Sequence, residues 1–405
     1  MASYQVLYRK YRPKDFSEVV GQDHIVSVLR RQIAHNRVAH AYLFSGPRGI
    51  GKTTVARLIA KAVNCTLYDG EGQSVAAWKA YERDQKLGGH EVIPVIGKDK
   101  ERPCNRCDSC LAFNAGHALN LIEIDAASNR GIDEIRELRE AVRFAPVEGR
   151  AKVYIIDEVH QLTKDAFNAL LKTLEEPPSH AMFILATTEL EKVLPTIVSR
   201  TQHFDFRRPR ETVIRERIAK IAAAEGVRLE ADAAEAIAFV AEGAMRDAES
   251  MLGKILAVGE TSVTRADVEE ILGIPKREAL RALFGHLGAK RLREALELLN
   301  ALYFGGYEME YLAKMLVGFF RDALMAKTAP GAAAAGADAA GKGSLLPESG
   351  KALADELGVW SASELARAIV LLVEAIEASR RSPIPQLPLE IAFITICSNE
   401  VAKTS

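Results

Sequence analysis

Apolar residues follow different periods in the two halves of the chain. In the first half, short continuous apolar runs alternate with longer segments in which apolar residues recur every three or four positions. Such runs are typical of buried strands, and such spacing is typical of helices. The predicted strands cover residues 41–45, 119–125, 152–157, 181–187 and 202–206. Because helices separate most of these strands, we predict an α/β fold with a parallel five-stranded sheet covered on both faces.

One helix of the first half is marked at both ends. Thr163 can cap its first turn, and Phe167, Leu170 and Leu174 recur on one face. Pro177 cannot continue a helix and marks its end. The sequence therefore predicts a helix between Thr163 and Pro177.

From about residue 208 the chain shows only helical periods, as at Ile214, Ile218 and Ile221. A Gly-Ile-Pro sequence at 273–275 predicts a boundary between two helical parts. Residues 328–345 are rich in Ala and Gly, which predicts a flexible loop without chemistry of its own.

The composition is that of a globular protein with more than one domain. Of the 405 residues, 48% are hydrophobic and 26% are charged, and the formal net charge is −1. This balance excludes a protein that is basic throughout. A basic segment at residues 9–14 is interpreted as a solvated face, with contact to nucleic acid as the alternative. We find no secretory signal and no apolar run long enough to span a bilayer, so we expect a cytoplasmic protein without membrane association.

A glycine-rich segment lies between the predicted strand at 41–45 and the next helix. It consists of Gly46, Pro47, Arg48, Gly49, Ile50, Gly51, Lys52 and Thr53, and Thr54 follows it. Its glycines allow a tight turn, so that consecutive N–H groups point at phosphate oxygens at the start of a helix. Lys52 would reach the β- and γ-phosphates, and the Thr53 hydroxyl would bind Mg²⁺. An ordinary glycine-rich turn is the alternative, but the flanking strand and helix favour a nucleoside triphosphate site.

Asp157 and Glu158 follow an apolar strand, at the edge where open α/β sheets bind ligands. Asp157 is suited to hold Mg²⁺, and Glu158 is suited to be the base that polarises water. In the simpler interpretation both residues only begin a loop, which the complete phosphate loop disfavours. Thr187 and Thr188 end the next strand, where they either sense the γ-phosphate or cap the following turn.

Two arginines lie far from the phosphate loop in the sequence. Arg200 is either a solvated surface residue or a finger that stabilises transition-state charge in a neighbouring subunit. Arg246, in the helical half, either reaches the nucleotide or forms an ion pair with Glu249. The sequence leaves these alternatives open.

Four of the five cysteines form a candidate metal site. Cys104, Cys107 and Cys110 have two successive C-x₂-C spacings, and Cys65 lies at the end of the phosphate-loop helix. Four thiolates suit a closed tetrahedral Zn²⁺ site, and the lack of an export signal argues against disulfides. An iron–sulfur cluster and free thiols are the alternatives. Cys397 lies in an apolar helical segment and is interpreted as a core residue.

These motifs together resemble one family. The matching segments are residues 8–13, 20–22, 46–53, 123–129, 155–160, 167–178 and 245–248. They are similar to the gamma/tau subunits of bacterial DNA polymerase III, AAA+ ATPases that drive the sliding-clamp loader. The resemblance is strong over about residues 4–275 and weaker beyond. The cysteine module after the phosphate-loop helix is its most discriminating feature.

The resemblance implies three domains. Residues 1–208 would form the nucleotide-binding domain, with a zinc module at about 65–110. Residues 209–274 would form a helical lid, and residues 275–405 a helical collar that joins subunits into a ring. The segment between Cys65 and Cys104 is longer than is usual in the family, which affects the local geometry but not the ligand set.

The resemblance also implies a role for each candidate residue. Lys52, Thr53, Asp157 and Glu158 would carry the chemistry of ATP and Mg²⁺, Arg12, Pro13 and Val20 would flank the adenine, Thr188 would sense the γ-phosphate, and Arg246 would act from the lid. Arg200 would act on the ATP of a neighbouring subunit. The family motif Ser-Arg-Cys reads Ser-Arg-Thr here, which leaves Arg200 in place.

The implied function is the opening of a sliding clamp and its loading onto primer–template DNA, within a hetero-pentameric ring of clamp-loader subunits. ATP would be hydrolysed, and DNA would not be polymerised by this chain. One alternative is a ring helicase that migrates DNA junctions, which would be expected to lack the cysteine cluster. Another is a structural ring subunit that uses no ATP, against which Lys52, Thr53 and Glu158 argue.

Overall fold

The computed structural model describes residues 5–35, 37–66, 102–146, 149–328, 358–379 and 381–398. The chain divides into two compact units. The first unit contains Met1–Pro209 and Ala244–Asp247, and the second contains Arg210–Gly243 and Ala248–Ser405. Most of the long segment between Cys65 and Cys104 and most of the Ala/Gly-rich segment lie outside the described residues. The division into three domains stays a prediction.

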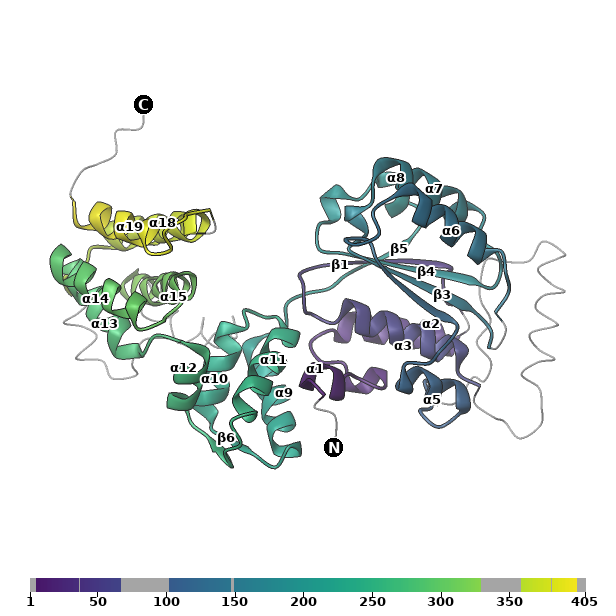
Figure 1. Cartoon of the computed structure of the whole chain (residues 1–405), viewed down its shortest axis with the longest axis horizontal. Coiled ribbons are helices and arrows are strands. Elements are labelled where there is room, and N and C mark those ends of the chain that lie inside the picture. Colours follow the sequence, from purple (N-terminus) through teal and green to yellow (C-terminus); the bar gives the residue numbers. More distant parts are fainter. Residues whose placement is uncertain are drawn as a thin grey trace. The chain divides into compact units, whose positions relative to one another are not determined.

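A parallel five-stranded sheet forms the centre of the first unit (Figure 1). Its strands are β1 (Ala41–Ser45), β2 (Leu121–Asp125), β3 (Lys152–Asp157), β4 (Ala181–Thr187) and β5 (Gln202–Asp205). Their order across the sheet is β2-β3-β4-β1-β5, and all neighbours are parallel. The predicted sheet is confirmed. β2 begins two residues later than predicted and β5 ends one residue earlier.

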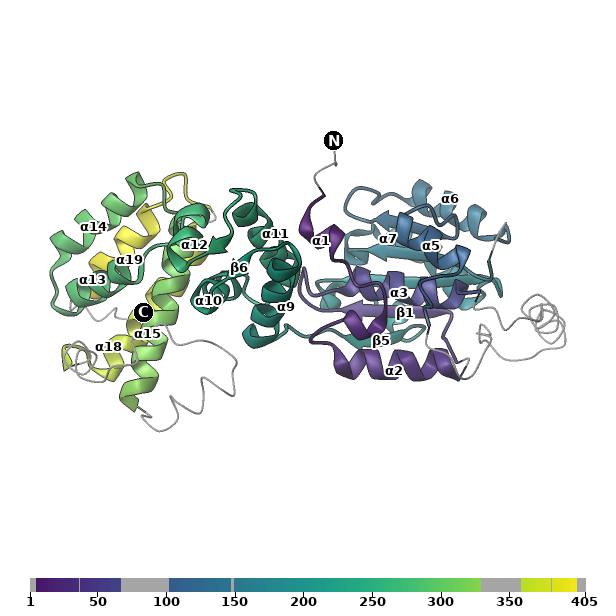
Figure 2. The same cartoon turned by 90° about the horizontal axis from the view of Figure 1, so that it is seen from below.

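Helices cover both faces of this sheet (Figures 1 and 2). One face carries α2 (Asp23–Ala34), α3 (Lys52–Asn64) and α5 (Asp108–Ala115), and the other carries α6 (Ile132–Val142), α7 (Lys164–Glu175) and α8 (Pro195–Val198). The shorter helical elements are α1 (Leu7–Lys10), η1 (Phe16–Glu18), η2 (Val159–Gln161) and η3 (Leu190–Lys192). Successive strand side chains point to opposite faces, so Tyr42 and Phe44 pack with α2 and α3, whereas Leu43 packs with α6 and α7.

Helix α7 agrees with the signals in its sequence. Thr163 is the N-cap, and its side-chain oxygen accepts a hydrogen bond from the Ala166 N–H at 3.3 Å. Phe167, Leu170 and Leu174 are buried in the core between α6, α7 and the sheet. The prediction of this helix is confirmed.

The second unit is mainly helical, as predicted. Its helices are α9 (Glu211–Ala224), α10 (Ala231–Val240), α12 (Arg265–Leu272), α13 (Arg277–Gly288), α14 (Leu292–Phe304), α15 (Met309–Thr328), α18 (Ala362–Ser379) and α19 (Leu387–Cys397). Helix α11 (Met245–Leu256) begins among residues of the first unit and continues in the second. No described helix of either unit combines the length and the apolar character that crossing a bilayer requires.

The sequence predicted no strands beyond about residue 208, and this prediction was wrong at one place. β6 (Arg228–Leu229) and β7 (Ser262–Val263) form a short parallel pair. Each of these strands has two residues, too few for an alternating apolar pattern to appear in the sequence.

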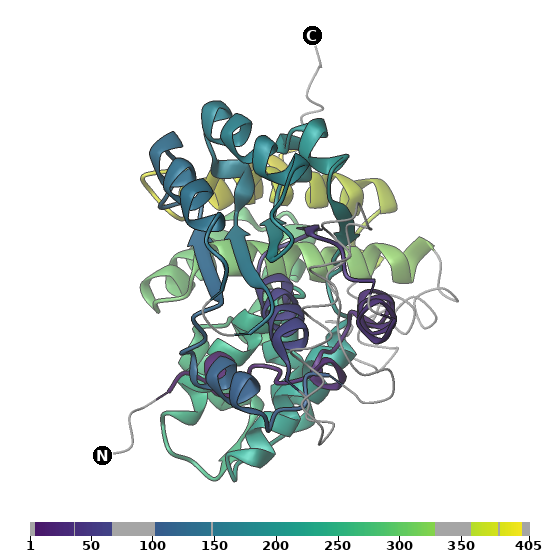
Figure 3. The same ribbon diagram turned by 90° about the vertical axis from the view of Figure 1, so that its right-hand side faces the viewer.

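An aromatic core holds the C-terminal helices together. Helix α15 packs along α18, as the green and yellow ribbons of Figure 3 show. The ring centroids of Phe284, Phe320 and Trp360 lie 4.8 to 5.3 Å apart, within the range of favourable aromatic pairs. Cys397, at the end of α19, is only half-buried, so its interpretation as a core residue was wrong. Helix α19 carries apolar residues at its buried and at its exposed positions, and Ile394 is one of the exposed ones.

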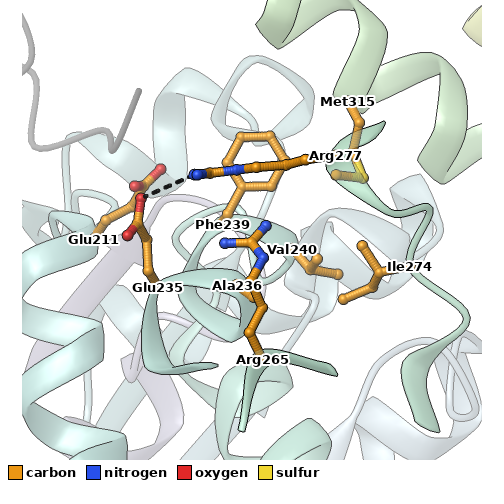
Figure 4. A pocket seen from close by; sticks show the side chains of 9 residues that line it. All are labelled: Glu211, Glu235, Ala236, Phe239, Val240, Arg265, Ile274, Arg277 and Met315. Atoms are coloured by element: carbon orange, nitrogen blue, oxygen red, sulfur yellow. Dashed lines mark ion pairs between the residues drawn. The ribbon is translucent and has the colours of Figure 1, made fainter. Parts of the chain in front are cut away.

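A small cavity lies within the second unit (Figure 4). Arg277 extends across it toward Glu235, with 3.9 Å between Arg277 Nη2 and Glu235 Oε1. Phe239 and Ile274 contribute apolar side chains to its lining. Its volume of about 10 Å³ leaves room for no more than one water molecule. The cavity is therefore a feature of packing and not a ligand site.

Candidate nucleotide and metal sites

The glycine-rich loop joins β1 to α3 through backbone conformations that favour glycine. Gly46, Gly49 and Gly51 have φ angles of 133°, 77° and 103°. A Cβ atom on Gly46 would lie 2.3 Å from the backbone oxygen of Phe206. Position 46 therefore requires glycine both for its conformation and for the close approach of the chain after β5.

Lys52 is buried inside this loop. Its Nζ donates to the carbonyl oxygens of Gly46 and Pro47 at 2.5 and 2.8 Å. Burial lowers the pKa of Lys52, while the carboxylates of Glu158 and Asp157 act in the opposite direction. The N-cap of α3 is a glycine without a capping side chain. The first turn of α3 therefore presents N–H groups beside an ammonium group, an arrangement suited to bind anions.

The other predicted loop residues have different surroundings. Ile50 is buried in the core between α2, α3 and the sheet, whereas Arg48 is exposed. Thr53 and Thr54, in the first turn of α3, are half-buried. The loop is thus anchored by the apolar side chain of Ile50, whereas Arg48 is accessible and Thr53 and Thr54 are partly accessible.

The end of β3 lies beside the first turn of α3. Thr53 Oγ1 donates to Asp157 Oδ2 at 3.0 Å, and Asp157 Oδ1 accepts from the backbone N–H of Glu158 at 3.0 Å. Thr53 and Asp157 are 104 residues apart in the sequence, so the fold creates this contact. The structure brings the two predicted magnesium ligands together.

Glu158 is held by the end of β4. Its φ and ψ of 49° and 44° are uncommon for a residue other than glycine. Glu158 Oε2 accepts from the backbone N–H and from the hydroxyl of Thr188, at 3.2 and 2.8 Å. These two hydrogen bonds put the candidate base in direct contact with the candidate sensor. Backbone strain of the kind seen at Glu158 is concentrated at functional sites.

His160 contacts Glu158 and the neighbouring Thr187 from within the protein. Its side chain is 3% exposed, and its Nδ1 lies 2.9 Å from Thr187 Oγ1 and 3.4 Å from Glu158 Oε2. Its Nε2 lies 3.1 Å from Glu189 Oε1. The sequence predicted no role for His160. Its place in a family motif directly after Glu158 and Val159 was the available signal.

Arg246 lies at the phosphate loop. Its backbone N–H donates to the carbonyl of Gly49 at 3.1 Å, and its guanidinium carbon lies 4.6 Å from the centroid of the Tyr8 ring. Hydrogen bonding to Arg246 lowers the pKa of the Tyr8 hydroxyl. Glu249, the alternative partner considered from the sequence, pairs with Arg217 at 3.1 Å. Tyr8 had no predicted role, because only the fold brings it to Arg246.

Arg200 lies just after α8 and contacts Glu175 at the end of α7 and Thr196 in α8. Its Nη2 lies 2.6 Å from Glu175 Oε1, and its Nη1 donates to the carbonyl oxygen of Thr196 at 2.9 Å. The Arg200 side chain is 35% exposed. These contacts hold the guanidinium at the surface of the first unit, where the finger role stays a prediction.

Arg12, Pro13 and Val20 lie on either side of η1. Arg12 and Pro13 line a cavity between the N-terminal segment, α3 and α5, and Val20 is half-buried. Gln22, directly after this segment, is fully buried and donates to the carbonyl oxygen of Arg207 at 2.7 Å. The segment is thereby fastened to the chain after β5, and its predicted contact with adenine stays a prediction.

The four clustered cysteines meet in space. The Sγ atoms of Cys65, Cys104, Cys107 and Cys110 all lie within 4.8 Å of one another. The backbone N–H groups of Cys107 and Cys110 donate to the sulfurs of Cys104 and Cys107 at 3.4 and 3.5 Å. A hydrogen bond from Cys110 lowers the pKa of Cys65 to about 5, and the same bond raises the pKa of Cys110.

The spacing of these sulfurs fits a single metal ion. Tetrahedral coordination with Zn–S bonds of about 2.3 Å places the sulfurs about 3.8 Å apart. Cys104 Sγ and Cys110 Sγ are separated by 3.9 Å. A cluster of several iron atoms would require the thiolates to be further apart. Four thiol donors at this spacing therefore fit one ion held without an open position.

Three family models match successive parts of the chain. "DNA polymerase III, delta subunit" matches residues 21–79 and 94–210. "DNA polymerase III clamp loader subunit, ATPase lid domain" matches residues 213–261. "DNA polymerase III subunits gamma and tau domain III" matches residues 263–404. All three descriptions name one polymerase, and the last names two of its subunits.

Named relatives align with most of this chain. DNA polymerase III subunit tau of Bacillus subtilis is 44% identical over 329 residues, which are 81% of this chain and 53% of that protein. The chain belongs to the gamma/tau family of DNA polymerase III subunits. Subunit tau of Escherichia coli is 37% identical over 330 residues, which are 82% of this chain and 47% of that protein. This gamma/tau chain spans about half the length of the curated relatives it matches.

The membership confirms the family that the motifs indicated. Among solved structures, the RuvB Holliday junction branch migration motor of Thermotoga maritima aligns with 74% of this gamma/tau chain and 86% of its own. That alignment has a TM-score of 0.45 and 20% identity, too weak a likeness to bear on function.

We expect Gly46→Ala to destabilise the gamma/tau chain more than Gly51→Ala. Both positions have a positive φ, but only the methyl group at position 46 would meet a backbone oxygen, at 2.3 Å, whereas position 51 has nothing within 4 Å. Urea unfolding should show a loss of about 1–3 kcal/mol for Gly46→Ala. An equal loss in the two variants would contradict the close approach of Phe206.

Proposed function

We propose that this chain is the ATP-driven motor subunit of a bacterial sliding-clamp loader, an AAA+ ATPase that opens the clamp and places it on primed DNA. One observation carries the proposal: the phosphate loop, with Lys52 and Thr53, lies in hydrogen-bond contact with Asp157 and beside Glu158. A subunit with only a structural role has no need of this set of groups. Membership in the gamma/tau family supports the assignment to the clamp loader.

The loop binds the triphosphate of ATP. Its N–H groups and the first turn of α3 donate to the phosphates, and Lys52 exchanges its bonds with Gly46 and Pro47 for bonds with the β- and γ-phosphate oxygens. Thr53 and Asp157 would hold Mg²⁺, which neutralises charge on the phosphates when it is bound. The hydrogen bond between Thr53 and Asp157 supports this pair of ligands, because it already brings the two side-chain oxygens together.

Glu158 is the base for the attacking water. Its carboxylate accepts the proton as the water oxygen bonds to the γ-phosphorus and the bond to the bridging oxygen of ADP breaks. Thr188 holds Glu158 by two hydrogen bonds, which supports a role for Thr188 as the sensor of the γ-phosphate. Arg246, beside Gly49, links the start of the lid to the occupied loop.

Assembly completes the site. Arg200 exchanges Glu175 for the γ-phosphate bound by a neighbouring subunit, where it stabilises transition-state charge. Residues 209–274 form the lid. Residues 275–405 form the collar, through which the chain assembles with other clamp-loader subunits into a hetero-pentameric ring. This ring is located in the cytoplasm. The ring holds the sliding clamp, and primer–template DNA aligns the arginine fingers, so that hydrolysis releases the clamp on DNA.

Cys65, Cys104, Cys107 and Cys110 hold Zn²⁺ in a structural role. Such an ion would join the end of α3 to the start of α5, and four thiolates would leave it no open position for chemistry.

The central test is ATP hydrolysis by the assembled ring with and without clamp and primed DNA. We expect turnover to rise only when both are present. Lys52→Ala should weaken ATP binding about 100-fold, because it removes the one ammonium group that neutralises the phosphates. Lys164→Ala, at an exposed position of α7, is the matched control. Stimulation by DNA alone would favour a junction motor, and no turnover under any condition would favour a structural subunit.

Arg200→Ala should lower kcat about 10³-fold and leave ATP binding unchanged, because the finger acts only on the transition state. Rings that mix Arg200→Ala subunits with Lys52→Ala subunits should recover part of the turnover, since the second variant supplies Arg200 to an intact neighbouring loop. A lack of recovery in mixed rings of normal size would show that Arg200 does not act in trans.

The purified chain should contain about one zinc ion per molecule, measured by inductively coupled plasma mass spectrometry. Cys107→Ser removes one thiolate and should lower both the zinc content and the thermal midpoint. Cys397→Ser, outside the cluster, should change neither. Iron in place of zinc, or equal zinc content in the two variants, would contradict the assignment.

A further inference from the structure

A second cavity lies in the first unit, apart from the phosphate loop. The N-terminal segment, one side of α3, the end of α5 and the start of β2 enclose it, and its volume is about 740 Å³. Sites for small molecules have volumes of roughly 300–1,000 Å³. Of the described residues that line this cavity, none belongs to the phosphate loop at 46–54.

The lining of the cavity is strongly positive. Its cations are Arg9, Lys10, Arg12, Lys14, Arg57 and Lys61, and its one carboxylate among the described residues is Glu123. The chain as a whole has a formal net charge of −1, so this concentration of positive charge is local. A concave surface lined by one sign of charge raises the local concentration of oppositely charged ligands.

Two guanidinium groups of the cavity, those of Arg12 and Arg57, lie close enough to repel each other. Arg57 Nη2 bonds to Glu123, but Arg57 Nε is buried without a partner in the described part of the chain. The half-buried guanidinium of Arg12 makes no hydrogen bond or ion pair with a described residue. Burial lowers the pKa of Arg12, and repulsion from Arg57 lowers it further. An anion between Arg12 and Arg57 would relieve this repulsion.

The walls of the cavity are held in place by Lys61. This buried side chain donates through Nζ to the carbonyl oxygen of Lys14 at 2.9 Å, and to the side-chain oxygens of Asn105 and Asn114. These bonds join the N-terminal segment, the cysteine module and α5 to α3. A site whose walls are already fixed loses little entropy when it binds a ligand. Phe113 on α5 adds an apolar surface.

We propose that this cavity binds a small phosphorylated anion of nucleotide size, with its phosphates between Arg12 and Arg57 and its uncharged part against Phe113. Guanidinium groups bind phosphate through paired hydrogen bonds. Apart from Glu123 the described lining offers no carboxylate to hold a metal or activate water, so the ligand is bound and not hydrolysed. It would fasten the N-terminal segment, which carries Tyr8 under Arg246, to α3 and so regulate the nucleotide site.

Binding by the full chain carrying Lys52→Ala tests this site, because that variant removes the ammonium group of the phosphate loop. With inorganic tripolyphosphate as the calorimetric probe, we expect one binding equivalent per chain. Adding Arg57→Gln should weaken binding at least tenfold, since a charge-assisted pair of hydrogen bonds is lost. Arg31→Gln, the same loss of charge at an exposed position of α2, should leave binding unchanged.

Two further titrations test whether the effect is a lost ligand contact and which ligand the cavity binds. Lys14→Gln leaves the pair between Arg57 and Glu123 intact and should also weaken binding, which separates a lost ligand contact from a disturbed fold. ADP bound more tightly than tripolyphosphate would identify a nucleotide as the ligand, and ADP bound equally or less tightly would identify a bare polyphosphate.

Three results would overturn the proposal: no saturable binding to the Lys52→Ala chain, equal binding by the Arg57→Gln and Arg31→Gln chains, or binding of single-stranded oligonucleotides only. The cavity includes Arg12 and Pro13, which were also predicted to flank the adenine of ATP, but tripolyphosphate binding and ATP turnover are measured separately. If the function proposed above fails, the ring assembled from unsubstituted chains shows no ATP turnover with clamp and primed DNA, while tripolyphosphate binding persists. If this site fails, ATP turnover remains.

Discussion

The hydrogen-bond ladder that joins β3, β4 and β1 is the constraint on which the candidate nucleotide site depends. Its register pairs Ser45 with Thr187 and Ile156 with Leu185, so that the three strands end at one edge of the sheet. A slip by one residue would turn every side chain of a strand to the opposite face. Because β1 and β4 are buried along their whole length, packing on both faces fixes this register. The contact between Thr53 and Asp157 therefore rests on apolar residues that touch no ligand.

Features encoded by neighbouring residues could be predicted from the sequence. The strand ranges of β1, β3 and β4 follow from continuous apolar runs, and α7 follows from its cap at Thr163 and its stop at Pro177. The loop before Lys52 was recognisable because its glycines, its strand and its helix are contiguous. The cysteine cluster was also recognisable, although Cys65 joins the other three only through the fold.

Features created by tertiary contact could not be predicted. The pairing of β6 with β7 depends on two short connections that the helices of the second unit bring together. Neither the contact of Tyr8 with Arg246 nor the proximity of Arg12 to Arg57 leaves a periodic signal in the sequence. The partial exposure of Cys397 escaped prediction for a related reason, since an apolar stretch does not reveal which side of its helix is left uncovered.

The bonds that Lys52 makes with Gly46 and Pro47 bear on the rate at which a nucleotide can leave. A departing phosphate does not strand a bare ammonium group in a poorly hydrated pocket, because two carbonyl oxygens are ready to receive it. This exchange of hydrogen-bond partners by Lys52 lowers the barrier to dissociation of the nucleotide. It also weakens the net affinity, since Lys52 is hydrogen-bonded both with and without the nucleotide. For a motor of the kind proposed, the trade favours rapid exchange of spent nucleotide over tight retention.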